Sequence, residues 1–494
     1  MAFLTEAANR GSIGGFDIDN SLKLEQDNSE YLKATNTFAN TTPTSIRTGT
    51  FSCWVKRTEI GAGGYQASVF VSGNSARYAI LYFQNDQIKI YSGDSSFNST
   101  YPLTNAVFRD TSAWYHIVLR FDSTDSTAAN RLRLYVNGEE QTWSTAPNIT
   151  QNGIITFAET GGPTWHAWGQ NYGYASPTNF FSGYLAEAQY IDGQALAPTE
   201  FGETDSDSGI WKPKEYDGTY GNVGYYLDFE DASNLGNDVS GNGFDFDLTN
   251  ITSADQATDT PTNNFCTLFP PPAAVTGTAP SIKEGGTTMF GGVSGTQNAF
   301  GTMGVRSGKW YFESTITNSG GVSTANHGFG VIDPEQITYV MTSGRDIGAS
   351  PAGWSCAGNA APRNNNVGAS GANSVTSAAV NVVLGCAIDM DNGKIWWHNA
   401  GTWHSLNNTV GNPANGTSPA WSNLLTATDN FVIPAGGLYH QNGNQARAMN
   451  FGGYAQAVFT AVGTYTDANG YGSFAYQPPS GYYALCSKNL AEYG

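Results

Sequence analysis

The sequence predicts an all-β protein in which two antiparallel β-sandwiches follow one another along the chain. The first observation is that apolar side chains alternate with period two in residues 112–140, 307–316 and 384–403, the repeat of strands with one face in a core. The second is composition: 59 glycines and only 13 % charged residues suit tight turns between short strands. The third is length, since 494 residues are enough for two domains that each bury a core.

The first half of the chain carries strand signals at the spacing of a sandwich. We expect residues 1–15 to be a polar N-terminal arm and residues 16–202 to be the first sandwich. Tyr115, Ile117 and Leu119 fall on one face of a strand, and Asn137-Gly138 is typical of a hairpin turn. Further strands are predicted at residues 21–25, 51–57, 68–73, 77–83, 87–93, 131–138, 154–157 and 180–196.

The middle of the chain changes character. Residues 203–268 form an accessory segment rich in Asp, Asn and Gly, which we expect to dock on the first sandwich or to lie between the two. Residues 269–288 are predicted to be a linker, because Pro270, Pro271 and Pro272 cannot donate to a strand ladder and favour an extended segment.

Residues 289–494 are predicted to form the second sandwich. Its strongest strand signals are residues 307–316, 328–334, 384–399 and 449–453. Trp396 and Trp397 are adjacent on one of these strands, so at most one ring can face inward and the other must be covered by a loop or a partner.

These strands resemble known families. WYHIVLRFD, LYVNGEE and SGYLAEAQYIDGQALAPTEFG occur in the order found in the laminin-G-like branch of the concanavalin A-like jelly rolls. SGKWYFE, GFGVIDP, LGCAIDMDNGKIWWHN and MNFGG resemble a SPRY (B30.2) domain. The chain also contains the segments GIWKPKEYDGTYGNVGYYLDF and, near its C-terminus, GYGSFAYQPPSGYYALCSKNL. In this combination of domains and segments, it is similar to virion or tail fibre proteins of marine bacteriophages, including cyanophages. That resemblance implies a virion structural protein, although the collagen-like, coiled-coil or β-helical stem of a fibre has no counterpart in this sequence.

Charge and cysteine content narrow the function classes. A net charge of −19 argues against a nucleic-acid surface, which needs a basic stripe. The five cysteines are widely spaced and include no CxxC pair, and Cys53 and Cys386 alternate with apolar residues like small core residues. The N-terminus has no basic start and no apolar core, and no run of about 20 apolar residues occurs, so we expect neither a secretory signal peptide nor membrane insertion.

One stretch is a candidate ligand site. Residues 161–177 place aromatic rings in a Gly- and Pro-rich stretch with little strand character, and such rings can stack on the C–H faces of a glycan. The alternative is that they pack over the sandwich edge or against a neighbouring subunit. The candidate ligand-binding residues are Trp165, His166, Trp168, Tyr172 and Tyr174.

Calcium is the cofactor that the sequence suggests. Laminin-G-like domains often carry a calcium ion, and the loop with Asp231, Asn234, Asp238 and Asn242 offers hard oxygen ligands at short spacing, although such residues are also ordinary turn formers.

Catalytic patterns are scarce, and we expect no enzyme. HExxH, GxSxG and P-loop motifs are missing from the sequence. Asp228 and Glu230 share a strand face as a glucanase pair would, but no glucanase cleft motif surrounds them, so they are interpreted as surface residues.

The sequence thus favours a bacteriophage virion protein, a tail fibre or tail appendage that adheres to a host surface glycan or protein. The first alternative is a decoration or assembly protein of the capsid or tail that makes no contact with a receptor. The second and less favoured alternative is a polysaccharide hydrolase. Its expected partners are other virion proteins, with a homo-oligomer, preferably a trimer, for avidity. Its expected location is the exterior surface of a virion assembled in the host cytoplasm.

Overall fold

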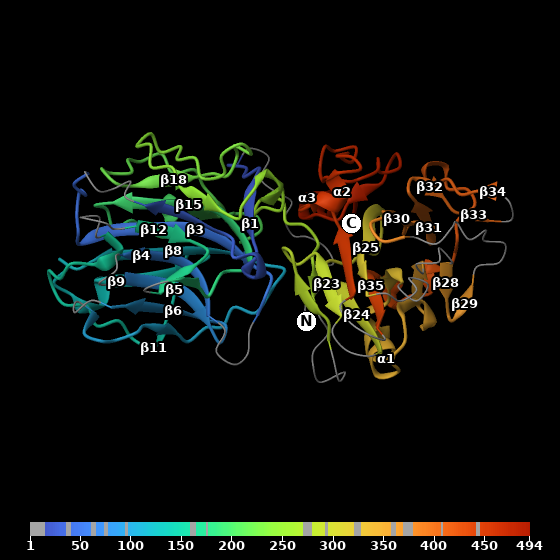
Figure 1. Cartoon of the computed structure of the whole chain (residues 1–494), viewed down its shortest axis with the longest axis horizontal. Helices are drawn as coiled ribbons and strands as arrows, with labels where there is room; N and C mark the ends of the chain where they lie inside the picture. Colours follow the sequence, from blue (N-terminus) through green and yellow to red (C-terminus); the bar gives the residue numbers. More distant parts are fainter. Residues whose placement is uncertain are drawn as a thin grey trace. The chain divides into compact units, whose positions relative to one another are not determined.

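The protein is all-β, as the sequence predicts. The computed structural model describes residues 15–35, 41–60, 66–73, 78–93, 97–158, 165–173, 176–269, 279–291, 295–320, 328–356, 362–368, 379–406, 409–440 and 445–494. The described residues up to Thr262 form one compact unit, and those from Asn263 to Gly494 form a second. Each unit is a sandwich of two antiparallel sheets, which confirms the predicted fold class (Figure 1).

Two eight-stranded sheets form the sandwich of the first unit, and two further sheets have two strands each. Sheet 1 has the strand order β10-β9-β8-β3-β15-β1-β20, with β18 also paired to β15. Its strands are β1 (Ser21–Leu24), β3 (Thr48–Arg57), β8 (Trp114–Asp122), β9 (Leu132–Val136), β10 (Glu139–Glu140), β15 (Gly183–Asp192), β18 (Tyr225–Leu227) and β20 (Gln256–Ala257). Sheet 2 has the order β11-β7-β6-β5-β4-β12-β2-β19. Its strands are β2 (Tyr31–Thr35), β4 (Gln66–Gly73), β5 (Tyr78–Gln84), β6 (Gln87–Ser92), β7 (Leu103–Thr104), β11 (Trp143–Thr145), β12 (Trp165–Trp168) and β19 (Asp247–Thr249).

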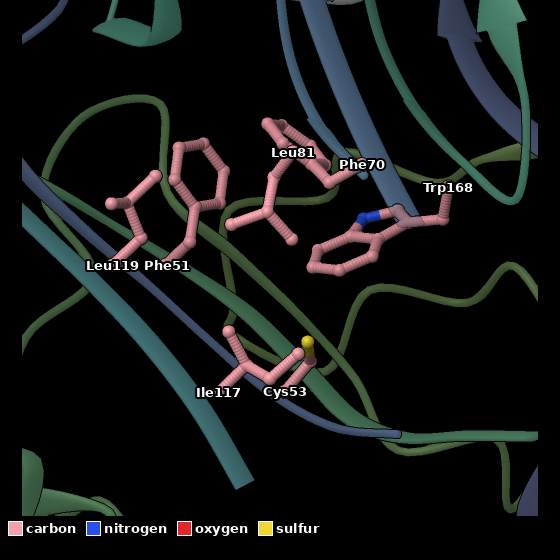
Figure 2. Close-up of a pocket in the computed structure, with 7 residues that line it drawn as sticks. All are labelled: Phe51, Cys53, Phe70, Leu81, Ile117, Leu119 and Trp168. Carbon is pink, nitrogen blue, oxygen red and sulfur yellow. The ribbon is translucent and has the colours of Figure 1, made fainter. Parts of the chain in front are cut away.

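The core of the first unit lies between sheets 1 and 2. Phe51 and Cys53 on β3 and Ile117 on β8 alternate with outward residues and are buried, which is the period-two pattern seen in the sequence. They meet Phe70 and Leu81 from sheet 2, as Figure 2 shows.

Residues 203–262 belong to the first unit and complete it. They supply β18 and β20 to sheet 1 and β19 to sheet 2. Phe201 and the following Tyr216 and Tyr220 pack on the outer face of sheet 1. The Lys56 ammonium on that face lies 2.6 Å from the Asp259 carboxylate, and both side chains are buried. Breaking such a pair is costly, because removing one partner leaves the charge of the other buried without a counter-ion.

The second unit also has two large sheets, together with a two-stranded one. Sheet 3 has the order β21-β24-β35-β26-β27-β28-β29. Its strands are β21 (Leu268–Phe269), β24 (Gly295–Gly301), β26 (Phe329–Ile332), β27 (Gly353–Cys356), β28 (Pro362–Asn364), β29 (Val367–Gly368) and β35 (Ile433–His440). Sheet 4 has the order β22-β23-β36-β25-β30-β31-β32, with β37 also paired to β25. Its strands are β22 (Ser281–Lys283), β23 (Thr288–Gly291), β25 (Lys309–Ser319), β30 (Leu384–Asp389), β31 (Lys394–Asn399), β32 (Thr402–Trp403), β36 (Gln445–Asn450) and β37 (Tyr483–Ala484).

The outer faces of the second unit are covered by its own chain. Helix α1 (Ile337–Thr342) packs on sheet 3, and the segment that ends in α3 (Ser487–Tyr493) packs on sheet 4. Trp397 lies in the core between the sheets, whereas Trp396 lies on the outer face of sheet 4 and contacts Tyr482 at 6.4 Å between ring centroids. This confirms the expectation that one ring of the pair faces inward and the other is covered.

Two boundaries differ from the expected ones. The units divide at Thr262 and Asn263 rather than at residue 268. The stretch expected to be a linker, residues 269–288, contains β22, whose Ile282 is buried and whose backbone pairs with β23, so this part of it is a strand of the second sandwich. Residues 270–278, which include the three prolines, lie outside the described residues, as does the expected N-terminal arm except Gly15.

The cysteines and helices agree with a simple β protein. All five cysteines are buried and free, which confirms the expectation for Cys53 and Cys386. None of the helices in the described part of the chain has the length and hydropathy needed to cross a lipid bilayer.

Candidate functional site

The stretch expected to be an aromatic loop contains a central strand. Trp165, His166 and Trp168 lie on β12, which hydrogen-bonds to β4 on one side and β2 on the other. Glycine and proline before the strand suggested a loop, but ladders on both sides place its residues inside sheet 2. Tyr172 begins a short hairpin on β13 (Asn171–Gly173), and its side chain lies outside the described residues, as does the whole of Tyr174.

His166 and Trp168 point into the core, so they are not available to a glycan. Both side chains are fully buried. Burial lowers the pKa of His166 to about 3, so the imidazole is neutral at physiological pH. The Trp168 indole Nε1–H donates to the Tyr225 hydroxyl at 3.2 Å.

Trp168 also borders a small cavity between the two sheets. Phe51, Leu81 and Ile117 are among its lining side chains, and Figure 2 shows them on one side of the indole ring. The cavity volume is about 10 Å³, roughly the space of one water molecule. Because its lining is apolar, this cavity is a packing gap in the core and not a ligand site.

Trp165 points the other way, to the outer face of sheet 2. There it packs with Val71, Ile80 and Tyr82. The Lys33 ammonium lies 5.3 Å from the centroid of the indole ring, within cation–π range.

The outer face of sheet 2 gathers aromatic rings from strands that are far apart in the sequence. We call Tyr78, Tyr82, Tyr91, Tyr101 and Trp165 the aromatic face. Tyr78 and Trp165 flank Gly73 in one row of the sheet, so no side chain stands between them on the strand that separates them.

Three tyrosines form a continuous ladder on this face. The ring centroids of Tyr78 and Tyr91 are 5.3 Å apart, and those of Tyr91 and Tyr101 are 5.0 Å apart with an interplanar angle of 15°. Tyr101 is 39 % exposed, and Tyr78 and Tyr91 are partly exposed. Tyr82 lies on the same face and is buried, and burial raises its pKa to about 12. The Tyr82 hydroxyl is therefore neutral at physiological pH, and the three rings of the ladder are at least partly exposed to solvent.

Polar groups border the ladder. Lys89 on β6 stands opposite Tyr82, and its Nζ lies 5.9 Å from the Tyr82 ring centroid and 5.8 Å from that of Tyr101. The same ammonium donates to Gln84 Oε1 at 3.0 Å. Gln87 on β6 stands opposite Gln84 on β5 and is also partly exposed. The face thus combines stacking surfaces with hydrogen-bonding groups at their edge.

Sequence reasoning missed this face for a physical reason. In residues 77–83 the outward Tyr78 and Tyr82 alternate with inward Ala79 and Leu81, so both faces of the strand are apolar or aromatic. A period-two pattern finds a strand there but cannot tell which face is the core. The signal that was present is tyrosine at outward positions of neighbouring strands, Tyr78 and Tyr82 on one and Tyr91 on the next, in runs whose other face is apolar.

Three of the four predicted calcium ligands, Asp231, Asn234 and Asp238, accept hydrogen bonds within turns through a side-chain oxygen atom. Asp238 accepts hydrogen bonds from the backbone N–H groups of Tyr226, Ser240 and Phe244. Asp231 accepts from the backbone and hydroxyl of Ser233.

The two asparagines of that set also form hydrogen bonds, one as an acceptor and one as a donor. Asn234 Oδ1 accepts from the Gly236 backbone, and the Asn242 amide donates to the carbonyls of Gly221 and Gly224. Within the described ranges, no group of three or more His, Cys, Asp or Glu side chains is arranged to hold a metal ion. The turn interpretation therefore accounts for all four residues.

One serine–histidine pair resembles a nucleophilic dyad, but the ring proton of its histidine is on the nitrogen that faces the serine. Ser52 Oγ lies 2.8 Å from His116 Nε2, and Trp211 Nε1–H donates to His116 Nδ1 at 3.0 Å. An indole nitrogen can only donate, so Nδ1 is the acceptor and Nε2 carries the hydrogen. His116 consequently cannot take a proton from Ser52, and the pair is structural.

Asp228 and Glu230 sit at the end of β18. The Asp228 carboxylate accepts from the Glu230 backbone N–H at 3.1 Å, as in a turn, and Glu230 is exposed. Burial raises the pKa of Asp228, and the neighbouring Asp231 adds to this effect.

Comparison with known proteins bears on the first unit. Residues 26–200 match the laminin G family model described as the concanavalin A-like lectin/glucanases superfamily. The match thus assigns residues 26–200 of the first unit to a concanavalin A-like domain. Its match spans sheets 1 and 2 up to residue 200, so it includes the aromatic face. No curated protein sequence is significantly similar to the chain.

Several solved structures are similar to parts of the chain at low identity. A putative carbohydrate binding protein from Bacteroides ovatus is 15 % identical over 47 % of this chain, with a TM-score of 0.33, and the chain spans 58 % of its length. A heptameric SAP-like pentraxin from Limulus polyphemus is 16 % identical over 37 % of this chain and 80 % of its own, with a TM-score of 0.27. The SPRY domain of human HERC1 is 15 % identical over 34 % of this chain and 89 % of its own, with a TM-score of 0.26.

Proposed function

We propose that the concanavalin A-like domain binds saccharides through the aromatic face. The observation that carries the proposal is the solvent-open ladder of Tyr78, Tyr91 and Tyr101 on a sheet that belongs to a lectin-type fold. Sugars present C–H faces that pack on aromatic rings, and their hydroxyl groups need donors and acceptors at the ring edges. Gln84 and Lys89 supply such groups next to the ladder.

The tyrosine rings of the ladder are held in place by contacts with one another. A ring that is held by its neighbours loses little conformational freedom when a ligand stacks on it. The buried Tyr82 and Trp165 belong to the same cluster as Tyr78 and Tyr91 on this face. The face is thus a preformed platform, and binding does not require the strands to rearrange.

We propose further that the chain is a bacteriophage virion protein that acts in adhesion at the tail. Its support is the resemblance of the strand motifs, the GIWKPKEYDGTYGNVGYYLDF segment and the C-terminal segment to virion proteins of marine bacteriophages. In this proposal the protein sits on the exterior surface of the particle, contacts other virion proteins, and presents several copies of a weak saccharide site, preferably as a trimer. A host surface glycan is then the ligand, and the protein binds it without cleaving it.

Glycan binding can be tested on the full chain with an array of neutral and acidic glycans. Tyr91→Ala removes the central ring of the ladder and should lower affinity for the bound glycans about tenfold or more, the equivalent of one aromatic contact of about 1.4 kcal/mol. Tyr465→Ala is the matched control, because Tyr465 is an exposed tyrosine of the second unit, at 45 %. Failure of the wild-type chain to bind any glycan on the array would contradict the proposal.

The virion role needs a separate experiment on phage particles. In an adhesion role, particles that carry Tyr91→Ala should assemble normally and adsorb poorly to host cells. Depletion of the variant from purified particles would instead favour the assembly role. Absence of the wild-type chain from purified particles would contradict a virion protein altogether.

A further inference from the structure

We propose that the aromatic face selects saccharides that carry negative charge, as carboxylate or sulfate groups, and that Lys89 is the residue that recognises the charge. This inference rests on the saccharide-binding role proposed above and adds the chemical class of the ligand. It follows from where Lys89 lies, what it contacts and what it lacks.

The position of Lys89 is central to the exposed part of the face. It stands on β6 between Tyr82 on β5 and Leu103 on β7, and its ammonium is within 6 Å of the Tyr82 and Tyr101 ring centroids. A sugar that stacks on Tyr91 or Tyr101 would therefore meet this ammonium at its edge. The tyrosine rings hold the cation in place by cation–π attraction, so its position is set before a ligand arrives.

Lys89 has no counter-ion in the described part of the chain. Its hydrogen bond goes to Gln84 Oε1, a neutral acceptor. An ammonium has three donors, so two remain for a ligand. Buried cations elsewhere in the first unit are paired, as Lys56 is with Asp259 and Arg57 is with Asp86. In a chain of net charge −19, a cation without a carboxylate partner on an aromatic surface is a distinct feature.

The other lysine of the face behaves differently. Lys33 lies over Trp165, and Asp247 stands directly opposite it on the neighbouring strand β19. Burial lowers the pKa of Lys33, and the Asp247 carboxylate acts against that shift. The positive charge of Lys33 is thus offset locally. Four strand spacings, about 19 Å at about 4.8 Å each, separate β2 from β6, so Asp247 does not neutralise the Lys89 end.

The ligand class follows from charge complementarity. An ammonium forms charge-assisted hydrogen bonds with carboxylate and sulfate oxygens that are stronger than those with hydroxyl groups. A neutral sugar uses the ladder alone, whereas an acidic sugar uses the ladder and Lys89 together. The face should therefore discriminate between the two, and the discrimination should weaken as salt screens the charge.

Dextran and dextran sulfate provide a matched pair of probes, and alginate provides the carboxylate. We expect the full chain to bind dextran sulfate, alginate or both at least tenfold more tightly than dextran. Lys89→Met should reduce that preference about tenfold, and Lys89→Arg should retain it. Lys214→Met changes net charge equally at an exposed lysine outside the face, and it should have no effect. Thermal unfolding of each variant checks that it is folded.

The outcomes separate the two proposals. If dextran binds as well as its sulfated form, or if Lys89→Met and Lys214→Met behave alike, charge selection by Lys89 is wrong. If Tyr91→Ala nevertheless abolishes binding of the polysaccharides, the proposed saccharide-binding role still stands. If none of the probes and none of the arrayed glycans binds, both proposals fail. Preference for alginate over dextran sulfate, or the reverse, identifies carboxylate or sulfate as the recognised group.

Discussion

Replacing Trp168 with alanine tests whether this ring belongs to the core or to the binding site. The side chain is fully buried between the two sheets of the first unit. Large-to-small changes of this kind cost about 3–5 kcal/mol in lost packing. The Tyr225 hydroxyl also loses the donor that lies 3.2 Å away, which adds about 1 kcal/mol.

The total, about 4–6 kcal/mol, is a large share of the roughly 5–15 kcal/mol that stabilises a typical domain. Urea unfolding followed by circular dichroism should therefore show the first unit of Trp168→Ala unfolding at much lower denaturant than the wild type. Trp168→Phe keeps an aromatic ring in the same space and loses the indole N–H, so its loss should be smaller, about 1–3 kcal/mol. The ranking wild type, Phe, Ala is the expected result.

Tyr91→Ala supplies the opposite pattern. Because Tyr91 is a partly exposed residue of the ladder, its removal should change stability little and weaken saccharide binding. If Trp168→Ala unfolds at the wild-type urea concentration and yet no longer binds saccharide, the reasoning from burial is wrong and Trp168 contacts the ligand.

Two further predictions concern carboxylates of the first unit. Burial raises the pKa of Glu187 to about 8, and the Tyr226 hydroxyl, which donates to it at 2.6 Å, opposes the shift. A raised folded-state pKa contributes stability that is complete below about 4.5 and is lost as pH rises through about 8. Glu187→Gln, which cannot ionise, should therefore be more stable than the wild type at pH 9 and similar at pH 4.5 in urea unfolding; an equal difference at both pH values would contradict the burial argument. The second prediction is that the protein does not cleave the saccharides it binds, because Asp228 and Glu230 form a turn. Incubation with bound polysaccharide should release no new reducing ends, and release that Asp228→Asn or Glu230→Gln abolishes would overturn it.

The sequence predicted the individual strands of this protein better than it predicted which strands lie next to one another. Tyr115, Ile117 and Leu119 alternate with polar or outward residues, and that pattern gives β8 directly. The adjacent Trp396 and Trp397 required one buried and one covered ring, because neighbouring residues on a strand point to opposite faces. Such statements depend on local geometry alone, so they hold wherever the strand is placed.

The candidate site was different, because it depends on which strands become neighbours. Trp165 and Trp168 looked like members of one aromatic loop, yet they lie on opposite faces of β12, one on the outer surface of sheet 2 and one in the core. Glycines around the strand suggested a loop, and the hydrogen bonds that override this tendency come from β4, about 95 positions away, and from β2, about 130 positions away.

What the sequence by itself determined was the all-β class and many of its strands, since side-chain alternation is fixed by the geometry of each strand. What only the tertiary structure decided was the aromatic face. Tyr78, Tyr91 and Trp165 come from three strands of sheet 2 and meet only when the sheet is assembled in its register. Register is a property of the paired strands and not of any one of them, and for that reason no local pattern could place these rings together.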